Sequence, residues 1–213
     1  ERKHRACAIA RVLKKLLPDA KMALRYSNPW ELTVAVILSA QCTDKKVNEV
    51  IARLFKKYQT LADYVVADPL AFEQDIRETG FFRAKAKNIL AAARVVHERF
   101  GGRVPCSMED LLTLPGVARK TANVILGNAC GIVEGIAVDT HVKRFAAKFD
   151  LSDSRDPNQI ERDLMALLPQ NEWYPITYRL IDYGRHFCPA RKHECGSHPL
   201  TKLYPRAATI WPK

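Results

Sequence analysis

Apolar residues recur at helical spacing along nearly the whole chain, and this periodicity limits the possible folds more than any other feature. In residues 3–17, for example, small and apolar side chains lie three or four positions apart up to Pro18, which is typical of a helix with one buried face. Alternation of apolar and polar residues never lasts more than a few positions. The sequence therefore predicts an all-α protein.

Prolines and glycines divide this pattern into separate helices. Pro29 fits the first turn of a helix that runs to about Cys42 and is apolar nearly all round, as a buried helix is. Asp44 fits the N-cap of the next helix, which extends to about Tyr58. Further helices are expected at 61–67, 69–79, 83–100, 107–113, 117–130, 140–149, 157–168 and 173–187.

A glycine-containing loop at 131–138 marks a topological boundary. We expect residues 22–132 to form a helical bundle that carries a hairpin of two helices at 107–130. The N-terminal helix, within residues 1–21, would pack with residues 133–213 as a second helical lobe. This arrangement would bring the two ends of the chain together.

The charge of the chain is concentrated at those two ends. The whole sequence has 34 basic and 23 acidic side chains, a net charge of +11. Residues 1–28 hold eight basic and two acidic groups, and residues 185–213 hold six and one. If the ends fold together they make one basic face, for which nucleic acid is the commonest partner. A solvated basic surface that aids solubility is the alternative.

The chain contains neither an apolar run of membrane-spanning length nor the apolar core of a signal peptide, so we expect an intracellular protein, in the cytoplasm or nucleoid if it is bacterial. Of six cysteines, four (Cys7, Cys42, Cys106 and Cys130) follow no regular spacing. Reduced thiols are the expectation for an intracellular chain.

The turn Leu114-Pro115-Gly116-Val117-Ala118 has the chemistry of a phosphate-binding site. Pro115 fixes its own φ and Gly116 permits a conformation that a side chain would resist. A helix begins directly afterwards, so several backbone N–H groups would point out of the turn at the positive end of a helix dipole. The turn alone could be any connection between helices, but the basic pair Arg119-Lys120 favours DNA binding.

At this point the sequence resembles a known family. LPGVARKTANVILGNA (114–129) followed by AVDTH (137–141) is similar to the helix-hairpin-helix and the catalytic aspartate loop of the endonuclease III family of DNA glycosylases. The resemblance extends, in the family's order, from about residue 20 to 200. It includes the segments LTVAVILSAQCTDKKVNEV (32–50), TGFFRAKAKNIL (79–90) and YGRHFCPARKHECG (183–196). It implies two helical lobes with a DNA-binding groove between them.

Lys120 is the candidate nucleophile. It lies in the first turn of the second hairpin helix beside Arg119, and both the helix dipole and this neighbouring cation disfavour an ammonium. We therefore expect a lowered pKa and an accessible neutral amine, which could attack the sugar carbon of a damaged nucleoside and form a Schiff base. The alternative is a lysine that only contacts phosphate.

Asp139 lies 19 residues after Lys120, at the start of another helix. The resemblance implies that this aspartate is essential, because a carboxylate there can stabilise an oxocarbenium-like sugar and help to move protons. A helix N-cap is the alternative role, and the two roles are compatible.

The resemblance also implies two side chains that fill the space left when a base is turned out of the duplex. Gln41 matches an intercalating glutamine, and Phe81 matches an apolar wedge position at which an aromatic ring can stack on the orphaned base. Alternatively, Gln41 simply ends a helix, and Phe81 lies in the core with Phe82 exposed instead.

The sequence departs from the family in the loop 188–204. Many relatives hold an iron–sulfur cluster with four cysteines spaced C-x6-C-x2-C-x5-C, whereas here Cys188 and Cys195 are followed by His198 and Tyr204. Two thiolates do not meet the requirement for four, so we expect no iron–sulfur cluster, no other cofactor, and simple packing of both cysteines. The alternative is zinc bound by Cys188, Cys195 and His198, with His186 or His193 as fourth ligand.

A second departure is Ala118, where the family's hairpin usually has glycine. A Cβ there should restrict the turn slightly and weaken DNA binding.

These features predict a monomeric, bifunctional DNA glycosylase and abasic-site lyase that removes oxidised or damaged pyrimidines from duplex DNA. Its DNA-binding residues would be Gln41, Phe81, Leu114, Pro115, Gly116, Val117, Ala118 and Arg119. Two alternatives stay open: a related glycosylase for purines, mismatches or photoproducts, and a helix-hairpin-helix DNA-binding module without catalysis. The joint presence of Lys120 and Asp139 disfavours the module.

Overall fold

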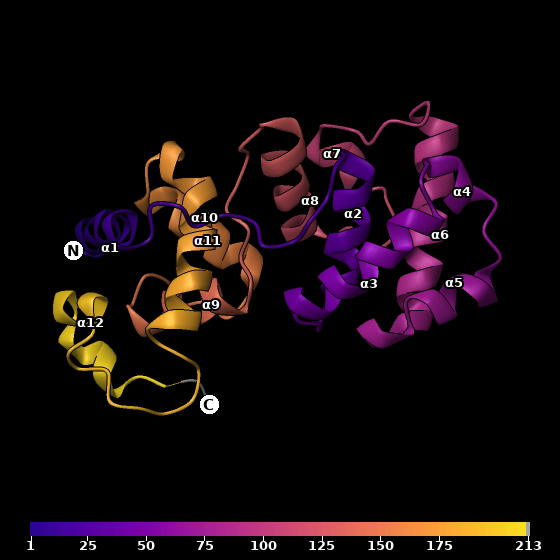
Figure 1. Cartoon of the computed structure of the whole chain (residues 1–213). Helices are drawn as coiled ribbons and strands as arrows, with labels where there is room; N and C mark the ends of the chain where they lie inside the picture. Colours follow the sequence, from indigo (N-terminus) through magenta and orange to yellow (C-terminus); the bar gives the residue numbers. More distant parts are fainter. Residues whose placement is uncertain (212–213) are drawn as a thin grey trace. The chain divides into compact units, whose positions relative to one another are not determined.

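The computed structural model describes residues 1–211, and all regular structure within that range is helical, which confirms the predicted fold class (Figure 1). Among these residues, no helix combines the length and the apolar character that crossing a lipid bilayer requires. Pro212 and Lys213, at the end of the predicted second lobe, lie outside the described residues.

The chain divides into two compact units. We call Ala23–Ile132 the hairpin unit and Glu1–Met22 with Val133–Lys213 the terminal unit. The hairpin unit contains α2 (Pro29–Leu38), α3 (Asp44–Lys57), α4 (Leu61–Val65), α5 (Pro69–Asp75), η1 (Arg77–Thr79), α6 (Phe82–Arg99), α7 (Met108–Leu111), α8 (Arg119–Ile125) and η2 (Leu126–Cys130). The terminal unit contains α1 (Arg2–Leu16), α9 (Thr140–Lys148), α10 (Pro157–Leu167), α11 (Gln170–His186), α12 (Pro199–Leu203) and η3 (Pro205–Thr209).

The hairpin unit is built around α2 and α6. Almost every residue of α2 is buried, as its all-apolar sequence predicts, and Asn28 caps it by accepting a hydrogen bond from the Glu31 N–H. Helix α6 packs against α2, α4, α5 and η1. Edge-on and tilted aromatic contacts, with ring centroids 5.2–5.8 Å apart, join α2 to the α3–α5 region and involve Trp30, Tyr58, Tyr64 and Phe72.

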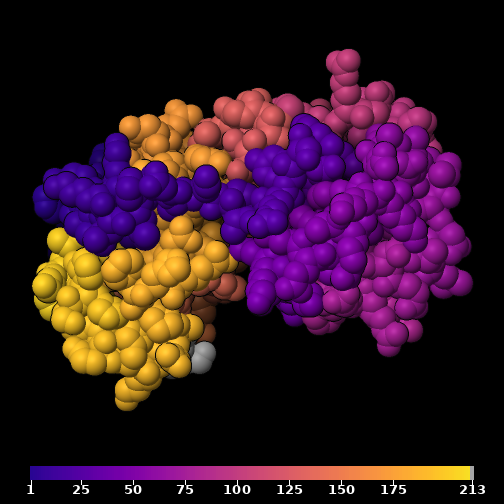
Figure 2. Space-filling view, in the orientation of Figure 1, coloured from indigo at the N-terminus to yellow at the C-terminus, as the bar shows by residue number. Residues whose placement is uncertain are grey.

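The terminal unit joins the two ends of the chain. Helix α1 packs against α10, α11 and α12, so the indigo N-terminal helix lies beside the yellow C-terminal segment (Figures 1 and 2). Arg5, buried on α1, donates from Nη2 to Asp150 Oδ2 over 2.7 Å, and its guanidinium lies 4.2 Å from the centre of the Tyr204 ring. The basic residues of both chain ends, apart from Arg25, therefore belong to one compact unit.

The observed helices differ from the predicted ones at several places. Helix α2 ends at Leu38 and not near Cys42, and the N-cap of α3 is Thr43 and not Asp44, which is the first residue of the helix. The helix expected at 69–79 breaks at Ile76, where α5 gives way to the short 3-10 helix η1. The helix expected at 117–130 starts at Arg119 and widens into a π-helix from Leu126. Helix α12 (Pro199–Leu203) and the 3-10 helix η3 (Pro205–Thr209) were not predicted.

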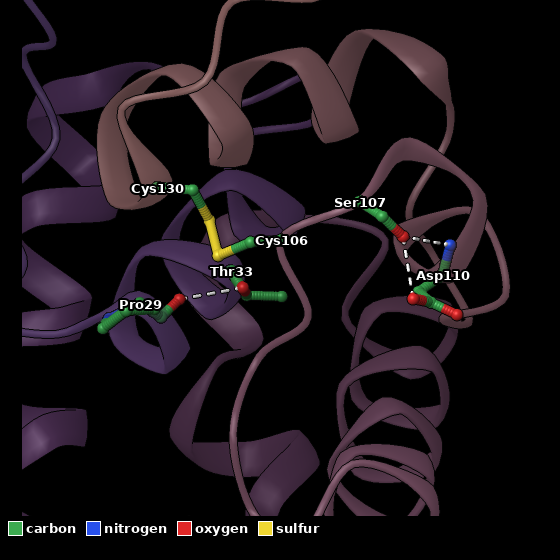
Figure 3. The surroundings of a disulfide bond; sticks show 6 residues. All are labelled: Pro29, Thr33, Cys106, Ser107, Asp110 and Cys130. Carbon is green, nitrogen blue, oxygen red and sulfur yellow. Dashed lines mark hydrogen bonds between the residues drawn. A yellow bond between two sulfur atoms is a disulfide. The ribbon is translucent and has the colours of Figure 1, made fainter.

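The expectation of reduced thiols is wrong for one pair of cysteines. Cys106 and Cys130 form a disulfide, with Cα atoms 5.8 Å apart (Figure 3). Cys106 directly precedes the N-cap residue of α7, and Cys130 ends η2, so the bond joins the two ends of the helical hairpin. The separation of 24 residues between the two cysteines does not predict the disulfide, because only the folding of the hairpin brings the two thiols together. Cys7, Cys42, Cys188 and Cys195 are free thiols, as expected.

Removal of this disulfide should destabilise the hairpin unit. Since it closes a loop of 24 residues, the double variant Cys106→Ala/Cys130→Ala should lose about 3 kcal/mol of unfolding free energy, mainly through a less constrained unfolded chain. Urea unfolding without reductant measures the difference. Cys42→Ala, which removes a free thiol, is the control and should unfold like the parent. A double variant as stable as the parent protein would contradict the assignment.

Candidate active site

The hairpin turn is defined by a cap, a buried pair and a glycine. Ser107 caps α7: its Oγ accepts from the Asp110 N–H at 3.1 Å and donates to Asp110 Oδ2 at 2.7 Å (Figure 3). Leu114 and Val117 are buried and anchor the turn, whereas Gly116 is exposed with φ of +82°. The predicted turn between two helices is thus present.

Gly116 is required for two independent reasons. Its positive φ is one that side chains disfavour, and a Cβ at this position would lie only 2.9 Å from the Asn88 Cβ on α6. The backbone of the turn therefore packs directly against α6. Ala118, the N-cap of α8, has φ of −93° and ψ of 171°, which any residue adopts. The methyl group of Ala118 accordingly adds no strain, contrary to the expected restriction of the turn.

Arg119 and Lys120 are the first two residues of α8, and both side chains are half-buried. The backbone N–H groups in the first turn of a helix have no carbonyl partner within that helix and form its positive end. Lys120 thus lies in the first turn of a helix, shortly after the Gly116 turn, as the sequence predicted.

Asp139 lies in the terminal unit and is the N-cap of α9. Its Oδ1 accepts a hydrogen bond of 2.8 Å from the Val142 N–H, and its side chain is half-buried. The capping role considered from the sequence is therefore present, and this bond fixes the orientation of the carboxylate.

His141, two residues later, was missed by the sequence reasoning. A Cβ at Gly184 of α11 would lie 2.3 Å from His141 Nδ1, so the glycine leaves room for the imidazole against α11. Burial lowers the pKa of His141, and the Asp139 carboxylate opposes this effect. A glycine inside the predicted helix 173–187 was the available signal, but nothing in the sequence linked it to position 141.

Gln41 and Phe81 share an unusual backbone. Their φ angles are +53° and +47°, and of the three non-glycine residues with positive φ among the described residues, only Asp150 lies elsewhere. Phe81 is 66% exposed whereas Phe82 is partly buried, so the core alternative for Phe81 does not hold. Left-handed backbone at a bulky residue costs of order 1–3 kcal/mol, and such strain concentrates at functional sites.

One buried ammonium supports both strained loops. Lys85 of α6 is 5% exposed, and its Nζ donates to the Leu38 carbonyl and to the Thr79 carbonyl, each at 2.8 Å. Leu38 lies three residues before Gln41, and Thr79 two before Phe81. Burial lowers the pKa of Lys85, so the two carbonyls are what make an ammonium tolerable there. Sequence reasoning gave this lysine no role.

Four metal-binding side chains meet in the loop after α11. The donor atoms of Cys188, His193, Cys195 and His198 all lie within 4.8 Å of one another. This group could hold a metal ion, so the structure does not support the expectation that the two cysteines serve only in packing. His186, also considered as a ligand, is exposed at the end of α11 and is not part of the group.

Comparison with known proteins is consistent with this geometry. The family described as HhH-GPD superfamily base excision DNA repair protein matches residues 34–170. The protein named Endonuclease III from Synechocystis sp. (strain ATCC 27184 / PCC 6803 / Kazusa) is 50% identical over 206 residues, which cover 97% of this chain and 94% of that protein.

Solved structures with the same fold include two complexes with DNA. A non-covalent complex of endonuclease III with DNA superposes with a TM-score of 0.92 at 40% identity, over 97% of each chain. A trapped covalent intermediate of endonuclease III with DNA, an estranged-adenine complex, superposes with a TM-score of 0.91 at 40% identity, again over 97% of each chain.

Replacement of Lys85 should loosen both strained loops. Lys85→Met keeps the length of the side chain but leaves the Leu38 and Thr79 carbonyls without their donor, so unfolding free energy should fall by about 1–3 kcal/mol. Amide hydrogen exchange should accelerate around Gln41 and Phe81. Lys87→Met, an exposed position on the same helix, is the matched control. Equal exchange rates in the two variants would show that Lys85 does not hold the loops.

Proposed function

Since the chain belongs to the HhH-GPD superfamily of base excision DNA repair proteins, and to the endonuclease III family within it, we propose that Lys120 and Asp139 carry out its chemistry. The protein is a bifunctional DNA glycosylase and abasic-site lyase of base excision repair. The observation that carries the residue assignment is the place of Lys120 in the first turn of α8, directly after the Gly116 turn.

In the first step the neutral Lys120 amine attacks C1′ of the damaged nucleoside. The bond from C1′ to the base breaks, and the base leaves with the electron pair and takes up a proton. Opening of the sugar ring at O4′ then gives a protonated imine between C1′ and Lys120 Nζ. The lysine side chain suits this step because its primary amine can form a double bond to C1′.

The lyase step uses the same imine. The positive nitrogen acidifies the C2′ protons, one of which is removed, and the C3′–O3′ bond then breaks in β-elimination. The strand is thereby cut on the 3′ side of the lesion. Water hydrolyses the remaining imine and restores the Lys120 amine. The protein gains and loses no electrons in this sequence.

Asp139 has the second role in the proposal. Positive charge develops on the sugar as the base departs, and a fixed carboxylate stabilises that charge. The same group can accept and return protons during ring opening. The hydrogen bond from the Val142 N–H supports this role because it holds the carboxylate in one orientation before the reaction begins.

Gln41 and Phe81 act on the DNA and not on the sugar. Chemistry at C1′ requires the damaged nucleotide to leave the base stack, and the vacated space must be filled. Phe81 presents an exposed aromatic ring that can stack on the orphaned base, with a gain of roughly 1–3 kcal/mol. Gln41 presents an exposed amide that can form hydrogen bonds with base edges. Their strained backbones support this assignment.

The hairpin turn is the proposed phosphate contact. Leu114 and Val117 hold the turn from inside, while Pro115, Gly116, Ala118 and Arg119 present the backbone and a guanidinium to the DNA. The net charge of +11 favours association with duplex DNA at low salt. We assign oxidised or ring-damaged pyrimidines as the lesions and propose that the protein acts as a monomer, inside the cell.

No iron–sulfur cluster is assigned to this enzyme. A four-iron cluster requires four thiolates, and the loop after α11 offers those of Cys188 and Cys195 alone. Two thiolates do not fit a four-iron cluster, and none of the reaction steps described above uses a cluster.

The nucleophile is tested by trapping. Borohydride reduces the imine to a stable amine, so the enzyme should become linked covalently to a duplex that contains an abasic site. Lys120→Ala should abolish the adduct. Arg119→Ala, the neighbouring residue, should weaken DNA binding but still give the adduct at saturating DNA. If the Lys120→Ala protein is trapped in the same yield as the parent, Lys120 is not the nucleophile.

Asp139→Asn separates catalysis from capping. Asparagine caps a helix as well as aspartate, so the thermal stability should stay close to that of the parent, whereas Asp139→Ala should cost about 1 kcal/mol. Base excision by the asparagine variant should fall roughly 10²- to 10³-fold because the amide carries no charge. Single-turnover excision and thermal melting are the two measurements. Unchanged excision in Asp139→Asn would leave Asp139 as a cap alone.

A further inference from the structure

The loop between α11 and α12 holds a group of donors that the glycosylase chemistry does not use. Cys188 and Cys195 are 0% and 1% exposed, and their sulfur atoms lie within 4.8 Å of one another and of a ring nitrogen of both His193 and His198. A tetrahedral zinc ion with its usual bond lengths separates its ligand atoms by roughly 3.3–3.8 Å. The four donors therefore need to move inward by about 1 Å or less to share one ion.

The two imidazoles carry buried nitrogens that nothing satisfies. His193 Nε2 and His198 Nδ1 are both buried without a hydrogen-bond partner among the described residues. An unpartnered buried polar atom costs roughly 1–3 kcal/mol, so two of them side by side need an explanation. A bound cation supplies one, because it would accept the lone pair of each nitrogen.

The other nitrogen of His193 fixes the form of the ring. His193 Nδ1 lies 2.8 Å from the Arg191 carbonyl oxygen, which can only accept a hydrogen bond. The proton of a neutral His193 is therefore on Nδ1, and Nε2 carries the lone pair. Histidines that bind metals are commonly held by such a bond from the second nitrogen to a backbone carbonyl.

The donor set selects the metal. We propose that Cys188, His193, Cys195 and His198 bind one structural Zn²⁺ ion where relatives carry an iron–sulfur cluster. Two thiolates and two neutral imidazoles cancel the charge of Zn²⁺, which suits a buried site, and mixed cysteine–histidine ligation is typical of zinc.

Two iron alternatives fit less well. A four-iron cluster lacks two of its thiolates, and Tyr204, at the fourth position of the family's spacing, is engaged by the Arg5 guanidinium. A two-iron cluster with two cysteines and two histidines binds each pair to a different iron, which keeps the pairs apart. Here all four donors lie within one short distance of each other.

The zinc ion would tie together three parts of the terminal unit. Cys188 lies two residues after the end of α11, and His198 is the N-cap residue of α12. The His193 ring also meets the Trp211 ring edge-on, with centroids 4.9 Å apart. With all four positions filled by protein, no site remains for water or substrate, so the role is structural and not catalytic.

Metal analysis of the full-length protein tests the proposal directly. Protein expressed with both iron and zinc available should contain close to one zinc per chain, little iron, and no visible colour. Replacement of zinc by Co²⁺ should give the visible absorption bands of a tetrahedral site with thiolate ligands. Bound iron with broad visible absorption, or neither metal in stoichiometric amount, would overturn the proposal.

Variants identify the ligands. His193→Ala should lose most of the bound zinc and lower the melting temperature, whereas His186→Ala, the exposed histidine at the end of α11, should keep one zinc per chain. His193→Cys supplies another zinc ligand and should retain the metal even if the alanine variant fails to fold. Full zinc content in folded His193→Ala would show that the ion is bound elsewhere.

Discussion

One face of helix α6 holds the two strained loops and the hairpin turn to which we assign the DNA contacts. Lys85 donates to the carbonyls at the bases of the Gln41 and Phe81 loops, and Asn88, one turn further on, packs against the backbone of Gly116. Residues three apart on a helix lie on the same face. The two loops and the hairpin turn are therefore all held by one face of α6. Without the Lys85 ammonium the left-handed conformations at Gln41 and Phe81 would have to be maintained by the loops alone.

The features that the sequence predicted are those that depend on local chemistry. Proline, glycine and capping residues act within a few positions, which is why the helices, the turn at Gly116 and the cap at Asp139 could be inferred from their neighbours. The disulfide between Cys106 and Cys130, the bond from Lys85 to two distant carbonyls and the contact of His141 with Gly184 all join positions far apart in sequence. Such contacts exist only after the helices have packed, and a single sequence carries no signal for them.

In the loop after α11, too, the sequence alone could not identify one residue of the proposed metal site. Counting from the family's cysteine spacing leads to His198, because it occupies a position in that spacing, but the choice between His186 and His193 stays open. The end of α11 favours His193: the helix continues through His186, whose side chain is exposed, whereas the His193 ring lies beside the two sulfur atoms. The proposed choice of ligand thus depends on where a helix stops, and helix ends are the least predictable part of a helical pattern.

The chemistry proposed for Lys120 is compatible with the proposed zinc site. Imine formation, elimination and hydrolysis move protons and electron pairs between the amine, the sugar and water, and the protein is neither oxidised nor reduced at any step. Zn²⁺ has no redox chemistry at all, so a site filled by it contributes only to the shape of the loop that it closes. The proposed steps of base removal and strand cleavage require no redox potential in that loop.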